Sequence, residues 1–340
     1  MKEKVLEKLS ECREGYVSGE ALSEFLGVSR TAVWKYIKEI KEEGYEIDAS
    51  SKKGYRLVSN NDILNSFEIG HHLNTEVIGK KIEYFDKIDS TNTYAKKIAF
   101  EGCSDGTVVV ADQQTAGKGR LGRVWESSAK KGIWMTVVLR PSIPPEDVQI
   151  ITLGTSVAVV NAIRNITGIK ADIKWPNDIV LEGRKVCGIL TEMSSEQDRV
   201  NYTVIGIGVN VNHREEDFPT ELRKLAVSLR SFAEEKGIDL KGLLNHGSIR
   251  RSKIIKGIIV ELEKIYFKLN RHQTSEIIQT WKEFSSTLGK AVRVTIKGVD
   301  YTGMAVDLTE DGKLVVDCDD GIRREVVSGE VMVRGILGYV

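Results

Sequence analysis

Three glycines and three cations share seven residues of this sequence, "GKGRLGR" at 117–123, directly after the stretch "GTVVVADQQTA". Glycine lets a backbone lie close against a ligand, and lysine and arginine side chains bind phosphate or carboxylate oxygens. The spacing of Gly117, Gly119 and Gly122 matches the G-x-G-x-x-G pattern of dinucleotide-binding turns, whereas Gly117-Lys118 suggests a P-loop. Either way, the chemistry indicated is the binding of a polyanion.

Neither familiar anion-binding motif fits its context. A P-loop needs a glycine where Asp112 stands and a serine or threonine after Lys118, where Gly119 follows. A dinucleotide-binding turn leads directly into a helix, but here the strand-like run "GIWMTVVLRP" comes next. The residues therefore predict a loop between two strands that clamps phosphates, or else an exposed basic loop without a ligand.

A second stretch, "KWPNDIVLEGRKVCGIL" at 174–190, carries both charges and a shaped turn. Pro176 biases the residue before it toward extended geometry, and Glu182-Gly183 is typical of a hairpin turn. Asp178 has the chemistry to bind magnesium or an amine, and Lys185 to neutralise a carboxylate or phosphate. The plain alternative for Asp178 is a turn-capping aspartate.

Composition narrows the class of protein. The 340 residues hold 49 basic and 49 acidic side chains, so no global field points to nucleic acid or a membrane surface. Charges interrupt every long apolar run, and the N-terminus lacks the apolar segment of a signal peptide. The 4 cysteines lie far apart and the 5 histidines lack metal-ligand spacing. We expect a cytoplasmic protein with reduced thiols, no metal site and no membrane contact.

The first sixty residues have a pattern of their own. A helix over 2–13 precedes two shorter helices joined by the turn "GVS", with Ser29 as the N-cap of the second. The apolar positions that should pack together are Ala21, Leu22, Phe25 and Leu26 in one helix and Val33, Ile37 and Ile40 in the next. Alternation on both sides of "SKKG" then predicts a β-hairpin. Helix-turn-helix followed by a hairpin is the outline of a winged helix.

The rest of the chain changes character twice. Strand-like runs with few helical crossovers follow the polar "SNND", which predicts an α+β domain with a mixed, mostly antiparallel sheet. A mostly helical pattern covers 221–284. Short strands separated by "KG", "EDG" and "DDG" then predict a small SH3-like β-barrel. The expected domains are 1–60, 61–285 and 286–340.

Four motifs in sequence carry a resemblance to a known family. "STNTYAK", "DQQTAGKGRLGRVW", "KWPNDIVLEGRKVCGIL" and "GIGVNVN" resemble biotin protein ligases in order and spacing. With the winged helix in front, the chain resembles the bifunctional form, biotin ligase and biotin operon repressor. The resemblance implies that biotin and ATP, with substrate-bound Mg²⁺, form biotinyl-5'-AMP, and that biotin then passes to a lysine of a biotin carboxyl carrier protein.

The resemblance also assigns roles to matching positions. The implied biotin contacts are Ser90, Thr91, Asn92, Gln114, Lys118, Gly119, Arg120, Lys185, Gly188 and Leu190. The implied ATP and adenylate contacts are Arg120, Arg123, Trp125, Asn177 and Asn210. Asp178, Lys185 and Arg120 are the expected catalytic residues, with Asp178 engaging the incoming lysine. Trp125 is expected to stack on the adenine, although an ordinary core tryptophan is the alternative.

For DNA, the resemblance implies an operator, a homodimer that forms on ligand binding, and the adenylate as corepressor. The candidate contacts are Ser29, Arg30, Thr31 and Lys35 of the recognition helix and Lys52 and Lys53 of the wing. Residues 1–60 hold 11 basic and 11 acidic residues, which predicts weak binding by a single domain.

The chain departs from some repressor members, which have arginine at the positions of Lys118 and Leu121. Lysine keeps the charge but lacks the guanidinium fork, and leucine removes a cation, so we expect weaker retention of the adenylate. Two alternatives stay open at this point. The protein is a biotin sensor that has lost turnover, or it is a ligase for another acid such as lipoate.

Overall fold

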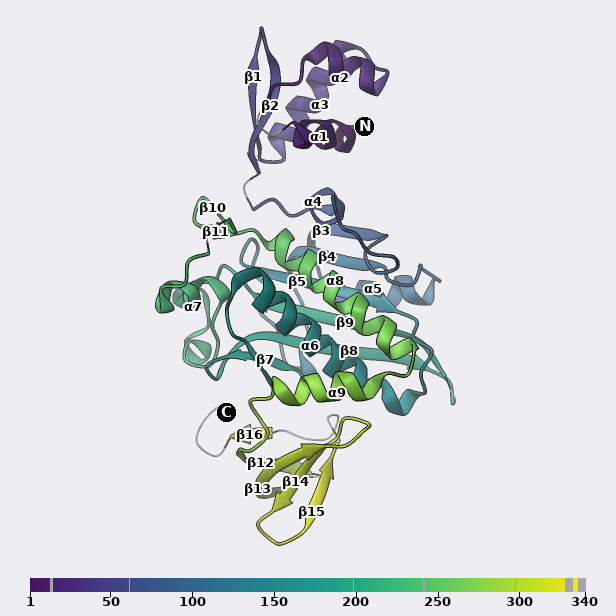
Figure 1. The fold of residues 1–340 in the computed structure, drawn as a ribbon, viewed down its shortest axis with the longest axis vertical. Coiled ribbons are helices and arrows are strands. Elements are labelled where there is room, and N and C mark those ends of the chain that lie inside the picture. Colours follow the sequence, from purple (N-terminus) through teal and green to yellow (C-terminus); the bar gives the residue numbers. More distant parts are fainter. Residues whose placement is uncertain are drawn as a thin grey trace.

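The computed structural model describes residues 1–12, 15–60, 62–197, 199–240, 242–296, 298–327 and 333–335. Its elements form three groups that follow one another along the long axis, with the N-terminal group at one end and the C-terminal strands at the other (Figure 1). The largest group, in the middle, holds the main sheet.

The N-terminal group is a winged helix. Its helices are α1 (Lys2–Glu11), α2 (Gly19–Leu26) and α3 (Arg30–Glu42), and its wing is the hairpin of β1 (Tyr45–Ser50) and β2 (Gly54–Asn60). Gly27 ends α2 with a φ of 63°, and the Ser29 hydroxyl accepts a hydrogen bond from the backbone of Ala32 at the start of α3. The predicted turn and cap are confirmed.

The first helix ends at Glu11, and its expected end at 13 lies outside the described residues. One detail of the winged helix was predicted wrongly. Only Leu22 and Leu26 of α2 are buried, whereas Ala21 is exposed and Phe25 is 50% exposed. An eight-residue helix has two turns, so one narrow stripe at i and i+4 suffices to cover the core beside it.

The middle group is built on a seven-stranded sheet with the order β3-β4-β5-β9-β8-β7-β6. The strands are β3 (Ile82–Ile88), β4 (Val108–Gln114), β5 (Gly132–Leu139), β6 (Asp172–Lys174), β7 (Asp178–Leu181), β8 (Arg184–Ser195) and β9 (Val200–Asn210). Only the β3–β4 pairing is parallel, and α5 (Thr91–Phe100) connects those two strands. The mixed, mostly antiparallel sheet is confirmed.

Helices cover both faces of this sheet. The long helices α6 (Val148–Thr167) and α8 (Arg251–Asn270), with α9 (Thr274–Glu283), pack on one face, where Val108 and Val110 point (Figure 1). Val109 points the other way, into a small cluster with α5. By length and composition the stretch Pro145–Thr167 could cross a membrane, but 72% of its most apolar window is buried inside the protein. It is the core helix of this domain.

Shorter elements connect these layers. They are α4 (Ser66–Gly70), α7 (Leu229–Lys236), the two-residue strands β10 (Leu244–Asn245) and β11 (Ser248–Ile249), and 3-10 turns at Arg120–Gly122, Pro145–Asp147, Glu215–Asp217 and Thr220–Leu222. The mostly helical pattern predicted for 221–284 is therefore interrupted by one small hairpin.

The C-terminal group is an antiparallel sheet of β12 (Ala291–Ile296), β13 (Val299–Leu308), β14 (Leu314–Cys318), β15 (Arg323–Val326) and β16 (Val333–Gly335). Its order, β15-β14-β13-β12-β16, puts β15 and β16 at opposite edges. The antiparallel C-terminal strands are confirmed, but among the described residues the sheet is open and does not close into the predicted barrel. Val292 and Val294 join the core of the middle group, so the two groups share one apolar interior.

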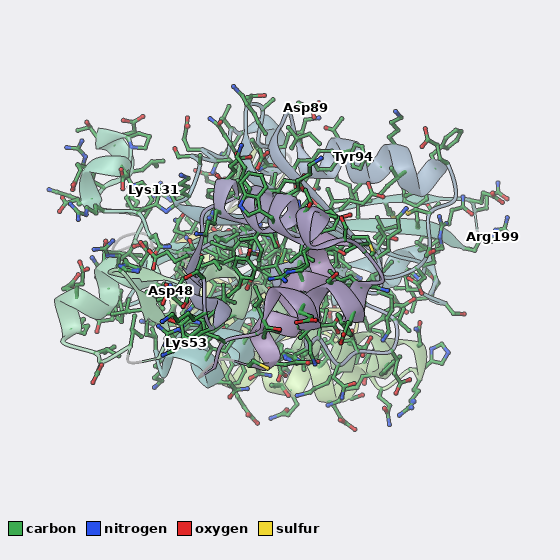
Figure 2. All side chains as sticks on the ribbon, turned by 90° about the horizontal axis from the view of Figure 1, so that it is seen from above. Asp48, Lys53, Asp89, Tyr94, Lys131 and Arg199 are labelled. Carbon is green, nitrogen blue, oxygen red and sulfur yellow. The ribbon has the colours of Figure 1, made fainter. Side chains whose placement is uncertain are left out.

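A few polar contacts join the winged helix to the middle group. The Ser10 hydroxyl lies 3.0 Å from Nε2 of His71, and the amide of Asn65 donates to the Tyr45 hydroxyl at 3.1 Å. Figure 2 looks down on the winged helix from above and shows Asp48 and Lys53 of the hairpin side on the same flank of the molecule as Lys131.

Candidate functional site

The middle group holds a cavity of about 1050 Å³. Its wall comes from the first turn of α5, the end of β4, the glycine-rich loop after it, β8, β9 and the segment 213–226. The lining includes Ser90, Thr91, Asn92, Gln114, Lys118, Gly119, Arg120, Arg123, Trp125, Asn177, Asp178, Lys185, Gly188, Leu190 and Asn210. The structure thus brings every residue predicted to contact biotin or the nucleotide to one cavity, while their individual roles stay predictions.

One end of the cavity is a small recess of ordered polar groups. Ser90 is the N-cap of α5, and Thr91 and Asn92 in its first turn are almost completely buried. The Gln114 side-chain oxygen accepts from the backbone nitrogen of Thr91 at 2.8 Å and from its hydroxyl at 3.0 Å. The Gln114 amide nitrogen donates to the Ser127 hydroxyl at 2.9 Å. Such a recess suits a compact ring that carries its own donors and acceptors.

The glycine-rich loop is folded back on itself as a tight hairpin. The backbone nitrogen of Gly119 donates to the carbonyl of Arg123 at 2.7 Å, and that of Trp125 to the carbonyl of Gly117 at 3.0 Å. A Cβ on Gly117 would lie 2.4 Å from the Trp125 carbonyl oxygen, so only glycine fits there. Leu121 at the tip has a φ of 55°. The loop connects two strands, β4 and β5, as predicted.

Arg120 is the cation of this loop that reaches furthest into the protein. Its guanidinium donates to the side-chain oxygen of Asn177 at 2.8 Å, and the Asn177 amide donates in turn to the Ile189 carbonyl at 2.7 Å. Burial lowers the pKa of Arg120, and the nearby Asp178 carboxylate opposes that effect. Lys118 and Arg123 are exposed around it. The loop therefore offers one fixed cation and two solvated ones to an anionic ligand.

Asp178 and Lys185 form an ion pair across the β7–β8 hairpin. Lys185 Nζ lies 2.6 Å from Asp178 Oδ1, and their side chains are 23% and 14% exposed. An incoming carboxylate or phosphate competes with Asp178 for the ammonium, and an incoming amine competes with Lys185 for the carboxylate. One pair can therefore serve an anionic and a cationic reactant in succession.

Trp125 lies against the sheet beside this pair. Its ring packs on β8 and β9 where both have glycine: a Cβ on Gly208 would be 2.6 Å from the indole nitrogen, and one on Gly188 would be 2.9 Å from the ring. Lys185 Nζ is 5.0 Å from the ring centre. The buried indole nitrogen has no hydrogen-bond partner among the described residues. Asn210, 6% exposed, contacts the Lys185 carbonyl at 3.5 Å.

Sequence reasoning missed several residues of this region. His213 lines the cavity, is 4% exposed and stacks on Phe218 with ring centres 5.0 Å apart. Burial lowers the pKa of its imidazole to about 4, so the ring is neutral near pH 7. Thr136 and Glu192 hold the recess from behind. A lone threonine inside the apolar strand "GIWMTVVL" was the signal for one of them; nothing local marked the others.

The cavity has the donors for a nucleotide-borne magnesium ion but not for a resident metal site. Among the described residues no group of three or more His, Cys, Asp or Glu could hold a metal ion. Asp178 supplies one carboxylate close to Arg120. A single carboxylate suits Mg²⁺, which keeps waters and substrate phosphates as its other ligands.

The winged helix presents the predicted DNA contacts at its surface. Arg30, Thr31 and Lys35 are exposed on α3, and Lys52 and Lys53 are exposed in the wing. Ser29 uses its hydroxyl to cap α3. Trp34, which sequence reasoning passed over, is 55% exposed on the same helix.

Comparisons with known proteins agree along most of the chain. The profile described as "Biotin/lipoate A/B protein ligase family" matches residues 84–210, that of an HTH domain matches 2–56, and that of "Biotin protein ligase C terminal domain" matches 287–334. The "Bifunctional ligase/repressor BirA" of Bacillus subtilis is 41% identical over 325 residues, covering 95% of this chain and 96% of the relative. That of Escherichia coli is 26% identical, with 93% and 92% covered.

A solved structure points the same way. The structure titled "Biotin protein ligase from Aquifex aeolicus in complex with biotin and ATP" superposes with a TM-score of 0.61 at 28% identity. The match covers 75% of this chain and 99% of the other.

Proposed function

Because the chain belongs to the biotin protein ligase family that includes the bifunctional ligase/repressors, we propose that it joins biotin to a biotin carboxyl carrier protein and represses transcription. Biotin and MgATP give biotinyl-5'-AMP and pyrophosphate, and a lysine of the carrier then takes the biotinyl group. The observation that carries the proposal is one cavity with a polar recess at one end and the Arg120–Asn177 and Asp178–Lys185 pairs beside it.

In the first step a biotin carboxylate oxygen attacks the α-phosphorus of ATP, and pyrophosphate leaves with the electrons of the broken P–O bond. Two anions must approach, so the barrier falls when cations neutralise them and fix the in-line geometry. We assign Lys185 to the carboxylate and Arg120, with Arg123 and Asn177, to the phosphate. Ser90, Thr91, Asn92 and Gln114 form the recess for the ureido ring, with Gly188 and Leu190 along the biotin chain.

In the second step the carrier lysine attacks the biotinyl carbonyl carbon and AMP leaves. We assign the Asp178 carboxylate to the incoming amine, which it would hold once the ligand carboxylate has drawn Lys185 away. The mixed anhydride must be protected from water, and we assign that task to the loop bearing Lys118, Gly119 and Trp125. Asn210 and Trp125 are the proposed neighbours of the adenine.

For repression we propose the finer picture that the sequence suggested. Ser29, Arg30, Thr31 and Lys35 of α3 and Lys52 and Lys53 of the wing meet operator DNA, and two copies pair when the adenylate is bound. Dimerisation supplies the affinity that a winged helix with balanced charge lacks. We further propose domains at 1–60, 61–285 and 286–340, and a cytoplasmic location.

The decisive experiment measures pyrophosphate release from MgATP with biotin, lipoate or no acid, in the absence of carrier. A biotin-dependent burst near one equivalent supports adenylation with a retained intermediate. Continuous biotin-dependent release still supports adenylation but shows that the adenylate escapes. Folded protein that releases none with any acid is a sensor without turnover, and release with lipoate alone makes it a lipoyl ligase.

A matched pair of variants links the activity to this cavity. Lys185→Ala should reduce the rate constant of the pyrophosphate burst by roughly a hundredfold, since it removes the cation beside the attacking carboxylate. Arg184→Ala is the control, because the neighbouring guanidinium pairs with Glu235 outside the cavity at 2.7 Å. Equal losses in both variants would contradict the assignment.

A further inference from the structure

The turn 174–178 lies at the edge of the main sheet, where β6 passes into β7, and the chain entering the C-terminal group runs beside it. The backbone nitrogen of Ile173 donates to the carbonyl of Phe284 at 2.7 Å, and that of Ser286 donates to the carbonyl of Ile173 at 2.8 Å. The segment 284–287, between α9 and β12, thus pairs with β6 as a further strand would. The C-terminal group therefore begins in contact with this turn.

Both N–H groups of Trp175 donate to this later part of the chain. The backbone nitrogen of Trp175 donates to the hydroxyl oxygen of Thr287 at 3.0 Å, and its indole nitrogen donates to the carbonyl of Gly312 at 3.3 Å. The Gly312 carbonyl also accepts from the Gln149 amide, at the start of α6, at 2.5 Å. Trp175 is 1% exposed and Thr287 is 0% exposed, so water cannot replace the Thr287 hydroxyl as the acceptor.

Gly312 lies in the turn between β13 and β14, where glycine suits both the backbone and the space around it. Its φ is 84°, and a Cβ there would lie 2.7 Å from Cδ1 of Leu153 in α6. The turn is held closed by Thr309, whose carbonyl accepts from the backbone nitrogen of Gly312 at 3.0 Å and whose hydroxyl accepts from that of Lys313 at 2.9 Å. A well-ordered turn of the C-terminal group thus places one carbonyl against the Trp175 indole.

The anchored Trp175 is the neighbour of residues that face the cavity. Ile173 and Trp175 belong to the apolar core, whereas Lys174 between them is 4% exposed and lines the cavity, as alternation along a strand requires. Asn177 and Asp178 follow within three residues and line the same cavity. The cavity face and the anchored face of the turn therefore belong to one short stretch of backbone.

The turn is held at two ends, and only one of them belongs to the main sheet. Asn177 is fixed to β8, because its carbonyl accepts from the backbone nitrogen of Ile189 at 3.0 Å, and Trp175 is fixed by the C-terminal group. Between them Pro176 has no N–H, and its ring fixes φ. A displacement of Trp175 therefore passes on to Asn177, which holds the Arg120 guanidinium at 2.8 Å.

We propose that Thr287 and Gly312 are positioning residues that hold the turn 174–178 so that its cavity face can bind the phosphate of ATP. The inference rests on the proposed function, in which Arg120 and Asn177 hold that phosphate. None of the described residues of the C-terminal group lines the cavity, so these two act through Trp175 and not by touching the ligand. The polar recess lies on α5 and β4, so the effect should fall on ATP and spare biotin.

The first test uses Thr287→Val, which keeps the shape but removes the acceptor of the Trp175 backbone nitrogen. We expect the ATP concentration that gives half the maximal rate of biotin-dependent pyrophosphate release to rise about tenfold, and that for biotin to stay within about twofold. Thr287→Ser should restore the wild-type value. The control is Thr167→Val: this buried hydroxyl accepts from the backbone nitrogen of Ile169 at 3.1 Å at the end of α6, away from the cavity, so both concentrations should stay unchanged.

A second test approaches the same contact through the other acceptor. In Gly312→Ala the new methyl group meets Leu153 and displaces the carbonyl from the Trp175 indole, so the same selective rise for ATP is expected. Gly321→Ala is the control, because Gly321 has a similar φ of 80° and nothing within 4 Å of an added Cβ. The two variants share the backbone strain, and only one disturbs the contact.

The inference would be overturned if Thr287→Val and Gly312→Ala lowered Tm but left the half-saturating ATP concentration unchanged, because the contacts would then be structural only. An equal rise for ATP and biotin would overturn it as well, and either result leaves the ligase assignment intact. If Thr287→Val does not fold, Gly312→Ala decides alone. Wild-type protein that releases no pyrophosphate with biotin would overturn the proposed function itself, and this inference with it.

Discussion

Replacing Asp62 by alanine should destabilise the middle domain far more than removing an exposed carboxylate whose ion pair has similar distances. Arg251, the first residue of α8, has a side chain that is 1% exposed, and its guanidinium lies 2.6 Å from Asp62 and 2.7 Å from Asp112. Burial alone would lower the pKa of Arg251, but the two carboxylates outweigh it and raise that pKa. Arg251 therefore stays charged in the interior because the two carboxylates compensate for the loss of hydration.

The size of the effect follows from what Asp62→Ala leaves behind. Asp62→Ala removes one of the two carboxylates that neutralise Arg251 and leaves Asp112 at 2.7 Å, so we expect a loss of about 3 kcal/mol, the low end of the range for breaking a buried ion pair. Asp62 also accepts from the backbone nitrogen of Arg251 at 2.7 Å, so it caps a helix whose own N-cap position, Arg250, provides no side-chain cap. For a domain of this size, such a loss lowers Tm by roughly 10 °C.

Scanning calorimetry on the full chain provides the measurement. The control is Asp317→Ala: Asp317 pairs with Arg323 at 2.6 and 2.9 Å, but both side chains are largely exposed. The Asp317–Arg323 pair has distances similar to those of the Asp62–Arg251 pair, but it lies at the surface. We therefore expect Asp317→Ala to leave Tm unchanged. Equal Tm shifts in the two variants would refute the reasoning that burial, and not distance, sets the value of the pair.

Three further predictions concern single residues. Burial lowers the pKa of His213 from 6.5 to about 4, so between pH 7 and pH 5 this imidazole gains a proton in the unfolded chain but not in the folded protein. The free energy of unfolding should therefore fall by about 2 kcal/mol over that range. Urea melts of His213→Phe should lack that part of the loss. Leu121→Arg adds a cation at the 63% exposed tip of the loop and should lengthen the lifetime of bound adenylate about tenfold in a filter-binding chase, whereas Leu121→Gln should not. Trp34→Ala should weaken operator binding about tenfold in anisotropy titrations without changing its salt dependence, because a base contact is lost and no phosphate contact is; an unaltered affinity would place Trp34 outside the interface.

Local sequence patterns predicted the elements that local physics determines. Ser29 is an N-cap because a short polar side chain reaches the backbone of its own helix, and the turn at Glu182-Gly183 forms because both residues adopt positive φ, 46° and 79°. The context of the glycine-rich loop was also readable, since strand-like runs flank it on both sides.

Features that depend on distant partners were not predictable in this way. Whether the last strands close into a barrel depends on whether β16 pairs with both edges of the sheet, and among the described residues it pairs with β12 alone. Phe25 follows the buried Leu22 by three residues, a spacing that usually puts two side chains on one helix face. Whether Phe25 is buried depends on the neighbouring helices, and here it is 50% exposed. Thr136 could be noticed as a polar residue in an apolar strand, yet its purpose depends on Asn92, 44 residues away in sequence.

Asp62 shows most clearly why the structural role of a residue cannot always be predicted from the residues next to it in sequence. The stretch "SNND" is polar and turn-prone, and those properties indicate a solvated link between domains. The same properties suit a carboxylate that neutralises a buried arginine, and the residue that decides between the two readings lies 189 positions later. Asn212, two residues after the end of β9, also contacts Asp62, at 3.4 Å, and exchanges hydrogen bonds with the backbone of Ile249 just before α8. The chain leaving the winged helix is thus fastened to the sheet, because the buried Arg251 of α8 pairs with Asp62 of the linker and with Asp112 of β4.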